Sequence, residues 1–149
     1  MQALTLYPML IKEKELKKFF NLSYGEKAPS REEWESLYNQ QVKFIDPTQE
    51  KNGIDAYIKA QDGLIKRCDD IYLESHSIAI NKNIAFVEWT MGLKIKGLEF
   101  LYDGTTRLIF DEEGKVKEHR DYFDFCSGTF GNIPVIGTFF RWLYSRFVD

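Results

Sequence analysis

The stretch from Ile71 to Phe125 most constrains the fold, because it holds four strand-like segments joined by short turn sequences. Each segment is rich in β-branched and aromatic residues, and Asn-Lys-Asn, Lys-Gly and Asp-Glu-Glu-Gly separate them. Strands joined by such short turns pair antiparallel, so the pattern predicts a four-stranded meander. The segments are IYLESHSIAI (71–80), IAFVEWTMGLKI (84–95), LEFLYDGTTRLIF (98–110) and KVKEHRDYFDF (115–125).

Helical periodicity dominates the chain before these strands. LIKEKELKKFF (10–20) has apolar residues near helical spacing, and Ser30 with Glu33 three residues later matches a capping box at a second helix start. The segment NGIDAYIKAQDGLIKRC (52–68) carries one apolar stripe typical of a third helix. The second helix is predicted to carry Trp34, Leu37, Tyr38 and Gln41 on one side and to end before VKFIDP, where Val42, Phe44 and Asp46 alternate on a short strand.

Helices that precede a run of strands predict an α+β fold, with helices covering one face of a mainly antiparallel sheet. We expect one domain over residues 1–149, in which residues 126–149 form a tail with a short amphipathic helix after Pro134 and Gly137. That tail is aromatic and carries two arginines, so a lid over a pocket or an oligomer contact is favoured over a membrane contact.

Composition narrows the functional classes. A net charge of −3 offers no basic field for nucleic acid, and we expect no nucleic-acid partner. Cys68 and Cys126 lie far apart without metal or redox spacing, which with the lack of a signal-peptide pattern predicts a cytoplasmic protein. His76 and His119 are too far apart to suggest ligand spacing, so neither a metal nor another cofactor is predicted. The aromatic content of 15% suits a core or the walls of a pocket.

The last strand-like segment has an unusual polarity. In KEHRDYFDF (117–125), alternation puts His119, Asp121 and Phe123 on one face and Arg120 and Tyr122 on the other. Neither face is purely apolar, as one face of a half-buried strand usually is. Residues two apart on a strand share a face, so His119 and Asp121 are close enough for an ion pair or a shared water.

Together, FIDP, NGIDAYI and RLIFDEEGKVKEHRDYFD resemble the nuclear-transport-factor-2-like superfamily, in particular its ketosteroid isomerase-like and SnoaL-like polyketide cyclase-like group. The resemblance covers about residues 30–125. It implies a cone-shaped fold of N-terminal helices on a curved sheet, an apolar pocket for a small, largely apolar molecule, and a homodimer through the outer sheet face. It also implies that His119, Asp121 and Phe123 face the pocket.

The resemblance also suggests roles for individual residues. Asp46 in FIDP matches the general base of the isomerases, and Asp121 matches the general acid/base of the cyclase-like proteins, with His119 beside it. The second isomerase acid falls on Thr106, and the isomerase tyrosine falls near Leu22, with Tyr24 only nearby. The predicted catalytic residues are therefore Asp46, Asp121 and His119, and the predicted ligand-binding residues are Phe44, Trp89, Met91, Thr106 and Phe123.

Several alternatives stay open at this point. Asp46 can instead start a turn, since Asp-Pro pairs commonly do. His119 and Asp121 can be a polar pair at a solvated pocket mouth that holds the C-terminal tail. The function can be an acid/base isomerase or cyclase, a non-catalytic ligand-binding module or a protein-interaction module, because a fold does not fix a function.

Overall fold

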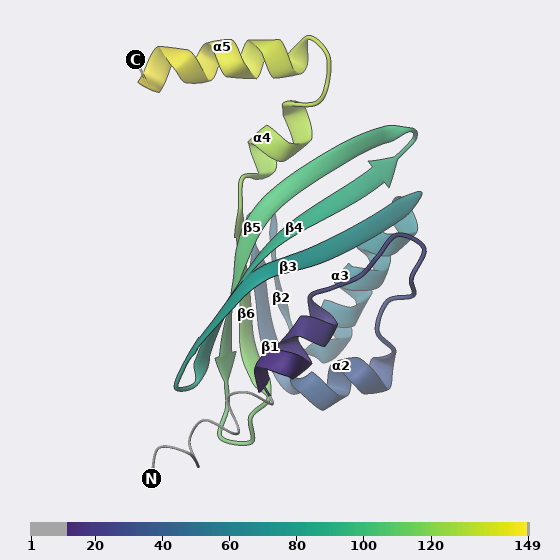
Figure 1. Cartoon of the computed structure of the whole chain (residues 1–149), viewed down its shortest axis with the longest axis vertical. Coiled ribbons are helices and arrows are strands. Elements are labelled where there is room, and N and C mark those ends of the chain that lie inside the picture. Colours follow the sequence, from purple (N-terminus) through teal and green to yellow (C-terminus); the bar gives the residue numbers. More distant parts are fainter. Residues whose placement is uncertain (1–11, 149) are drawn as a thin grey trace.

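The computed structural model describes residues 12–148, and a curved six-stranded sheet dominates it (Figure 1). The strand order is β2-β1-β6-β5-β4-β3. All neighbouring strands pair antiparallel except β1 and β6, which run parallel. The strands are β1 (Tyr38–Asp46), β2 (Gln49–Asn52), β3 (Asp70–Asn81), β4 (Ile84–Ile95), β5 (Leu98–Phe110) and β6 (Val116–Phe123).

The predicted meander is confirmed by β3 to β6, which are joined by the predicted turns. Lys82 and Lys96 adopt positive φ angles of 55° and 51° in the first two turns, as hairpin connections of this length require. β6 ends at Phe123, two residues earlier than predicted, because the Asp124 side chain accepts a hydrogen bond from the Ser127 amide and begins helix α4.

Three helical segments come before the meander. A first helix spans residues 12–19 of the described chain, followed by α2 (Arg31–Leu37) and α3 (Ile54–Arg67). The capping box at Ser30 and Glu33 is confirmed, with both reciprocal hydrogen bonds present. Gly53 precedes α3 with a φ of 87°, a conformation that glycine adopts without strain.

The helix prediction was wrong for Tyr38 and Gln41, which belong to β1 rather than to α2. Here β1 gains hydrogen bonds to β6 on one side and to β2 on the other, and these non-local pairings override the local helical periodicity. β2 was not predicted, since its sequence QEKN carries no apolar alternation.

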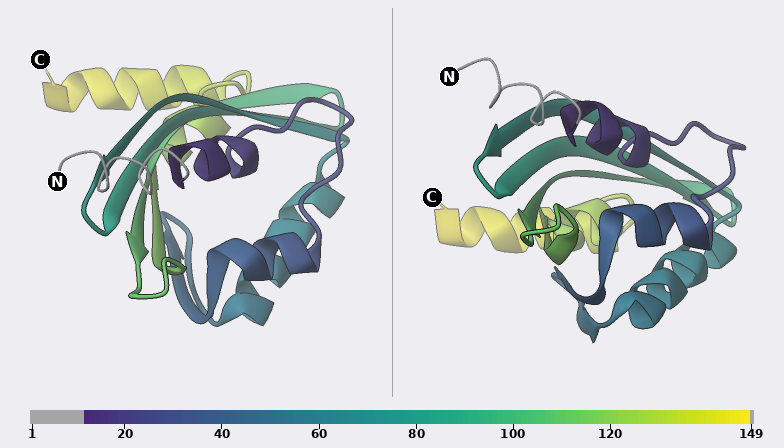
Figure 2. Two further views of the ribbon diagram at one scale, coloured as in Figure 1. Left: turned by 60° about the horizontal axis from the view of Figure 1, so that its bottom comes forward. Right: turned by 90° about the horizontal axis from the view of Figure 1, so that it is seen from below.

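The first helix, α2 and α3 cover the concave side of the sheet, as the views in Figure 2 show. The core lies between these layers, where Leu37, Val42, Val87, Leu108 and Val116 have no exposed surface. Each of these residues comes from a different element, so the core joins α2 to four strands of the sheet. The α+β prediction, with helices on a curved and mainly antiparallel sheet, is confirmed.

The C-terminal tail forms two helices, α4 (Phe125–Phe130) and α5 (Ile136–Val148), rather than the one short helix that was predicted. α5 extends away from the sheet at one end of the molecule (Figure 1), and Trp142, Tyr144 and Phe147 are 53–83% exposed on it. The expected lid is not formed, because no residue of α5 lines the cavity described below. No helix among residues 12–148 is long and apolar enough to cross a membrane.

Candidate functional site

A cavity of about 250 Å³ lies between the concave face of the sheet and the helices. Aromatic and aliphatic side chains form most of its wall, and polar groups from β1, β2, α3, β5 and β6 interrupt it. All eight residues predicted for the site line this one cavity: Phe44, Asp46, Trp89, Met91, Thr106, His119, Asp121 and Phe123. The structure therefore brings all of them together around the same space.

Strand pairing explains why β6 turns its polar face toward the cavity. His119 lies between Phe44 of β1 and Leu108 of β5 in the sheet, and Asp121 lies opposite Thr106 of β5. The partner residues on β1 and β5 are buried and face the cavity side of the sheet. The strand register therefore puts His119 and Asp121 on that side as well. His119 is 4% exposed, which makes it one of two buried polar residues in the described chain; the other is Thr106.

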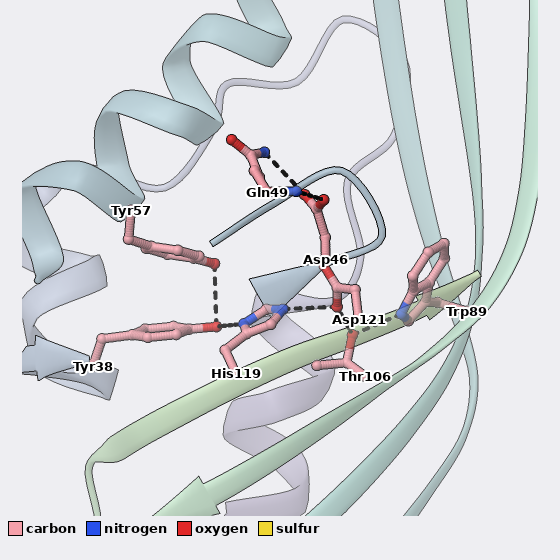
Figure 3. Close-up of polar contacts among 8 residues, drawn as sticks. All are labelled: Tyr38, Asp46, Gln49, Tyr57, Trp89, Thr106, His119 and Asp121. Carbon is pink, nitrogen blue, oxygen red and sulfur yellow. Dashed lines mark hydrogen bonds and ion pairs between the residues drawn. The ribbon is translucent and has the colours of Figure 1, made fainter. Parts of the chain in front are cut away.

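His119 and Asp121 make direct contact at the centre of this face (Figure 3). The Nε2 atom of His119 lies 2.8 Å from Oδ1 of Asp121. The same oxygen accepts a hydrogen bond from the Thr106 hydroxyl at 2.5 Å, and the indole Nε1–H of Trp89 donates to that hydroxyl at 2.8 Å. Both of these contacts are on Oδ1, no hydrogen bond among residues 12–148 involves the other oxygen, Oδ2, and the Asp121 side chain is 17% exposed.

The position of Trp89 depends on a glycine in the next strand. Gly104 pairs with Trp89 across β4 and β5, and a Cβ atom at residue 104 would lie 2.5 Å from the indole ring. Glycine leaves the space in which the indole ring lies against β5 and reaches Thr106.

On its other side, His119 contacts two tyrosines that were not predicted as site residues. The Tyr38 hydroxyl lies 2.8 Å from Nδ1 of His119, and the Tyr57 hydroxyl donates to the Tyr38 hydroxyl at 3.2 Å (Figure 3). Burial raises the pKa of both phenols well above the usual value, so both stay protonated at neutral pH. Their sequence signal was weak, because each fits an apolar helical stripe in which a tyrosine is read as a core residue.

Asp46 lies at the edge of the cavity with both carboxylate oxygens engaged. Oδ1 accepts hydrogen bonds from the amides of Thr48 and Gln49 and from the Thr48 hydroxyl, at 2.7–3.0 Å. Oδ2 accepts one from the Gln49 side chain at 2.9 Å. These contacts shape the turn between β1 and β2, which is the alternative that the Asp-Pro pair suggested.

The positions matched to the isomerase tyrosine lie outside the cavity. Leu22 forms an isolated bridge with Leu73, and the Tyr24 hydroxyl donates to Glu99 at 2.8 Å. Desolvation and the Glu99 carboxylate raise the pKa of Tyr24 to about 12. The phenols that reach the His119 and Asp121 pair therefore come from β1 and α3.

A curved sheet with helices over its concave face gives this chain the nuclear-transport-factor-2-like fold. The SnoaL-like domain matches residues 17–119, and the chain belongs to the SnoaL-like family. No curated protein matches the sequence.

Solved structures share this fold at low sequence identity. A protein of Jannaschia sp. CCS1, assigned as a SnoaL-like polyketide cyclase, superposes with a TM-score of 0.62 at 15% identity, covering 70% of this chain and 78% of that one. A protein of Agrobacterium tumefaciens C58, assigned as an isomerase of the SnoaL-like family, superposes with a TM-score of 0.61 at 12% identity, covering 77% of this chain and 96% of that one. A protein of Catenulispora acidiphila with a ketosteroid isomerase-like fold, in complex with trimethylamine, superposes with a TM-score of 0.59 at 15% identity, covering 65% of this chain and 76% of that one.

Proposed function

We propose that this protein binds a small, largely apolar molecule and catalyses acid/base chemistry on it, with Asp121 as the proton-transfer group. The observation that carries the proposal is the state of the Asp121 carboxylate. The Thr106 hydroxyl donates to Oδ1 and the His119 imidazole contacts the same oxygen, while no side chain among residues 12–148 binds Oδ2 of this carboxylate, which lines a mostly apolar cavity. A carboxylate fixed in this way is aligned for proton transfer before a ligand arrives.

The chemistry that suits this site is proton abstraction from a carbon next to a carbonyl group. Oδ2 would take the proton, and the C–H electron pair would pass into an enolate. Asp121 would then return the proton at another atom, which is isomerisation, or the enolate carbon would attack a second carbonyl, which is cyclisation. The isomerase and cyclase assignments of the structural neighbours agree with this class of reaction.

Cavity size limits the ligand. An apolar cavity of about 150 Å³ in another protein is large enough for benzene, so about 250 Å³ suits a molecule of one or two rings. Phe44, Trp89, Met91 and Phe123 would contact its apolar surface, and Thr106 would act through Asp121. Asp46 would shape the rim of the site, since its oxygens already bind the β1–β2 turn.

A probe reaction tests the proposal without knowledge of the natural ligand. 5-Nitrobenzisoxazole opens to a coloured cyanophenolate when a base removes one carbon-bound proton, and it has two fused rings. We expect saturable ring opening by this protein, faster than by an equal concentration of acetate. Met91→Trp fills the cavity but keeps Asp121, so it should abolish saturation.

Two results would count against catalysis. Absence of saturable turnover would contradict the enzyme proposal. Saturable binding of the same probe without turnover, measured by calorimetry, would support the alternative of a non-catalytic ligand-binding module. That alternative has one structural argument, since the contacts of Asp121 Oδ1 also stabilise the fold by satisfying a partly buried carboxylate.

We also propose a homodimer through the outer sheet face, where Phe86, Leu101 and Tyr122 are 45–49% exposed. Half-exposed aromatic and aliphatic groups beside arginines are typical of protein interfaces. Sedimentation equilibrium should give about 35 kDa, twice the chain mass of 17.5 kDa, and Tyr122→Glu should shift it toward the monomer. A monomeric mass at micromolar concentration would overturn this proposal.

Cys68 and Cys126 are free thiols, which supports the cytoplasm as the location.

A further inference from the structure

We propose that Tyr38 is a positioning residue, supported by Tyr57, which sets the direction of the hydrogen bonds through His119 and so keeps Oδ1 of Asp121 an acceptor that carries no proton. This inference deepens the proposed function, since it concerns the same proton-transfer group. Its spectroscopic test does not need turnover, so the two proposals can fail separately.

Six polar side chains form one continuous series of hydrogen bonds in which every hydrogen can be assigned an acceptor: Tyr57, Tyr38, His119, Asp121, Thr106 and Trp89. On one side, Tyr57 donates to Tyr38, Tyr38 donates to Nδ1 of His119, and Nε2–H of His119 donates to Asp121. On the other side, Trp89 donates to Thr106, and Thr106 donates to Asp121. Both sides end on Oδ1 of Asp121, so in this direction Oδ1 accepts both hydrogen bonds and carries no proton of its own.

The opposite direction leaves a buried hydrogen without an acceptor. If Nδ1 of His119 carried a hydrogen, it would donate it to the Tyr38 hydroxyl, and Nε2 would either accept a hydrogen from Asp121 or carry a second hydrogen of the ring. The hydrogen of either Tyr38 or Tyr57 would then have no acceptor within the chain, although these residues are 1% and 2% exposed. An unsatisfied buried donor is strongly unfavourable, so the tyrosine pair selects the neutral Nε2–H form of His119.

Packing holds the two phenols in place. The rings of Tyr38 and Tyr57 are stacked with centroids 4.6 Å apart, and the ring of Trp34 stands edge-on to both at 5.6 and 5.3 Å. This arrangement keeps the Tyr38 hydroxyl within reach of His119 before any ligand binds. The Tyr38 hydroxyl is engaged with Nδ1 of His119, so its effect on Asp121 passes through the imidazole.

Few other groups near His119 could determine which of its ring nitrogens carries the hydrogen. β1 contributes Tyr38 and the ring of Phe44, α3 contributes Tyr57, and the segment after the first helix contributes the ring of Phe20. Within the described residues, Asp121 is the one charged side chain in contact with the imidazole. The direction of the hydrogen bonds through His119 is therefore decided by the phenols of Tyr38 and Tyr57 and by the carboxyl group of Asp121.

Nitrogen-15 NMR of the imidazole groups tests the assignment directly. The chain has two histidines, so His76→Gln leaves one set of imidazole signals, that of His119. We expect the neutral Nε2–H form at pH 7, with Nδ1 shifted by an accepted hydrogen bond. In Tyr38→Phe the Nδ1 signal should move to the value of a free acceptor, whereas Tyr57→Phe should cause a smaller change.

Kinetics with 5-nitrobenzisoxazole adds a second readout. Tyr38→Phe should lower kcat about tenfold with little change in KM, because misalignment of a base slows the chemical step more than binding. Tyr24→Phe removes a tyrosine hydrogen bond far from the cavity and should change neither the NMR signals nor kcat. Tyr57→Phe should fall between these two variants.

Three outcomes would overturn the proposal. The Nδ1–H form of His119, or a mixture of both forms, in the chain with wild-type tyrosines would contradict the assigned direction. An unchanged Nδ1 signal in Tyr38→Phe would show that the phenol does not donate to His119. An unchanged kcat in a folded Tyr38→Phe variant would show that Tyr38 has no positioning role.

Discussion

Asp121→Asn is expected to lower kcat for 5-nitrobenzisoxazole at least a hundredfold. General base catalysis contributes roughly 10²- to 10⁴-fold to a rate, and the asparagine nitrogen has no free electron pair with which to accept a proton. The amide has almost the same shape as the carboxylate, so its oxygen can still accept hydrogen bonds from His119 and Thr106. The variant should therefore fold, and probe binding should change much less than turnover.

Two further variants make this experiment specific. Asp103→Asn makes the same chemical change at an exposed position on the opposite face of the sheet and should leave kcat unchanged. Asp46→Asn discriminates between the two carboxylates that the sequence suggested as proton-transfer groups. We expect it to lower stability through the β1–β2 turn while most of the turnover remains. Loss of turnover in Asp46→Asn, with activity retained in Asp121→Asn, would reverse the assignment.

The sequence predicted most of the sheet because its signals there are local. Turn residues and alternating side chains located β3 to β6 within two residues at each end, with β6 shortened by the cap at Asp124. Its failures were at Tyr38 and Gln41, and at β2, where long-range pairing decides the structure. The strand predicted from Val42 to Asp46 extends back to Tyr38 in β1 because β6 lies beside it in parallel, and no pattern within residues 38–41 indicates that neighbour.

The candidate site was predicted in part for the same physical reason. Alternation on β6 and the family resemblance led to His119 and Asp121. Their contact could be predicted because residues two apart on a strand share a face. Tyr38 and Tyr57 come from a different strand and a helix, and their hydroxyls meet His119 only after the layers pack. A buried tyrosine and a tyrosine that serves a site have the same local pattern, so only the tertiary structure distinguishes them.

The same two tyrosines should make the protein strongly unstable in alkali. Burial raises the pKa of Tyr38 and Tyr57 in the folded chain well above about 10, the value in an unfolded chain. Below pH 10 both states keep these protons, and the two residues add no pH dependence. As pH rises above 10, the unfolded chain releases the protons and the folded chain keeps them, so the free energy of unfolding falls.

The size of this loss follows from proton linkage. Each group lowers the free energy of unfolding by up to ~1.4 kcal/mol per pH unit above 10, so the two together remove up to ~5 kcal/mol by pH 12. A domain of this size has a total stability of about 5–15 kcal/mol, so the loss is a large part of it. Urea unfolding followed by circular dichroism at pH 8, 10, 11 and 12 measures the decline.

Comparison of variants separates these tyrosines from lysines, which also lose protons in this range. Tyr57→Phe should be less steep in its decline than the wild type between pH 10 and 12, by up to ~1.4 kcal/mol per unit. Tyr144→Phe, at a residue that is 69% exposed on α5, should keep the wild-type slope. Parallel declines for all three proteins would mean that Tyr57 is not held protonated by the fold. The direction of the His119 hydrogen bonds would then no longer follow from the burial of Tyr38 and Tyr57.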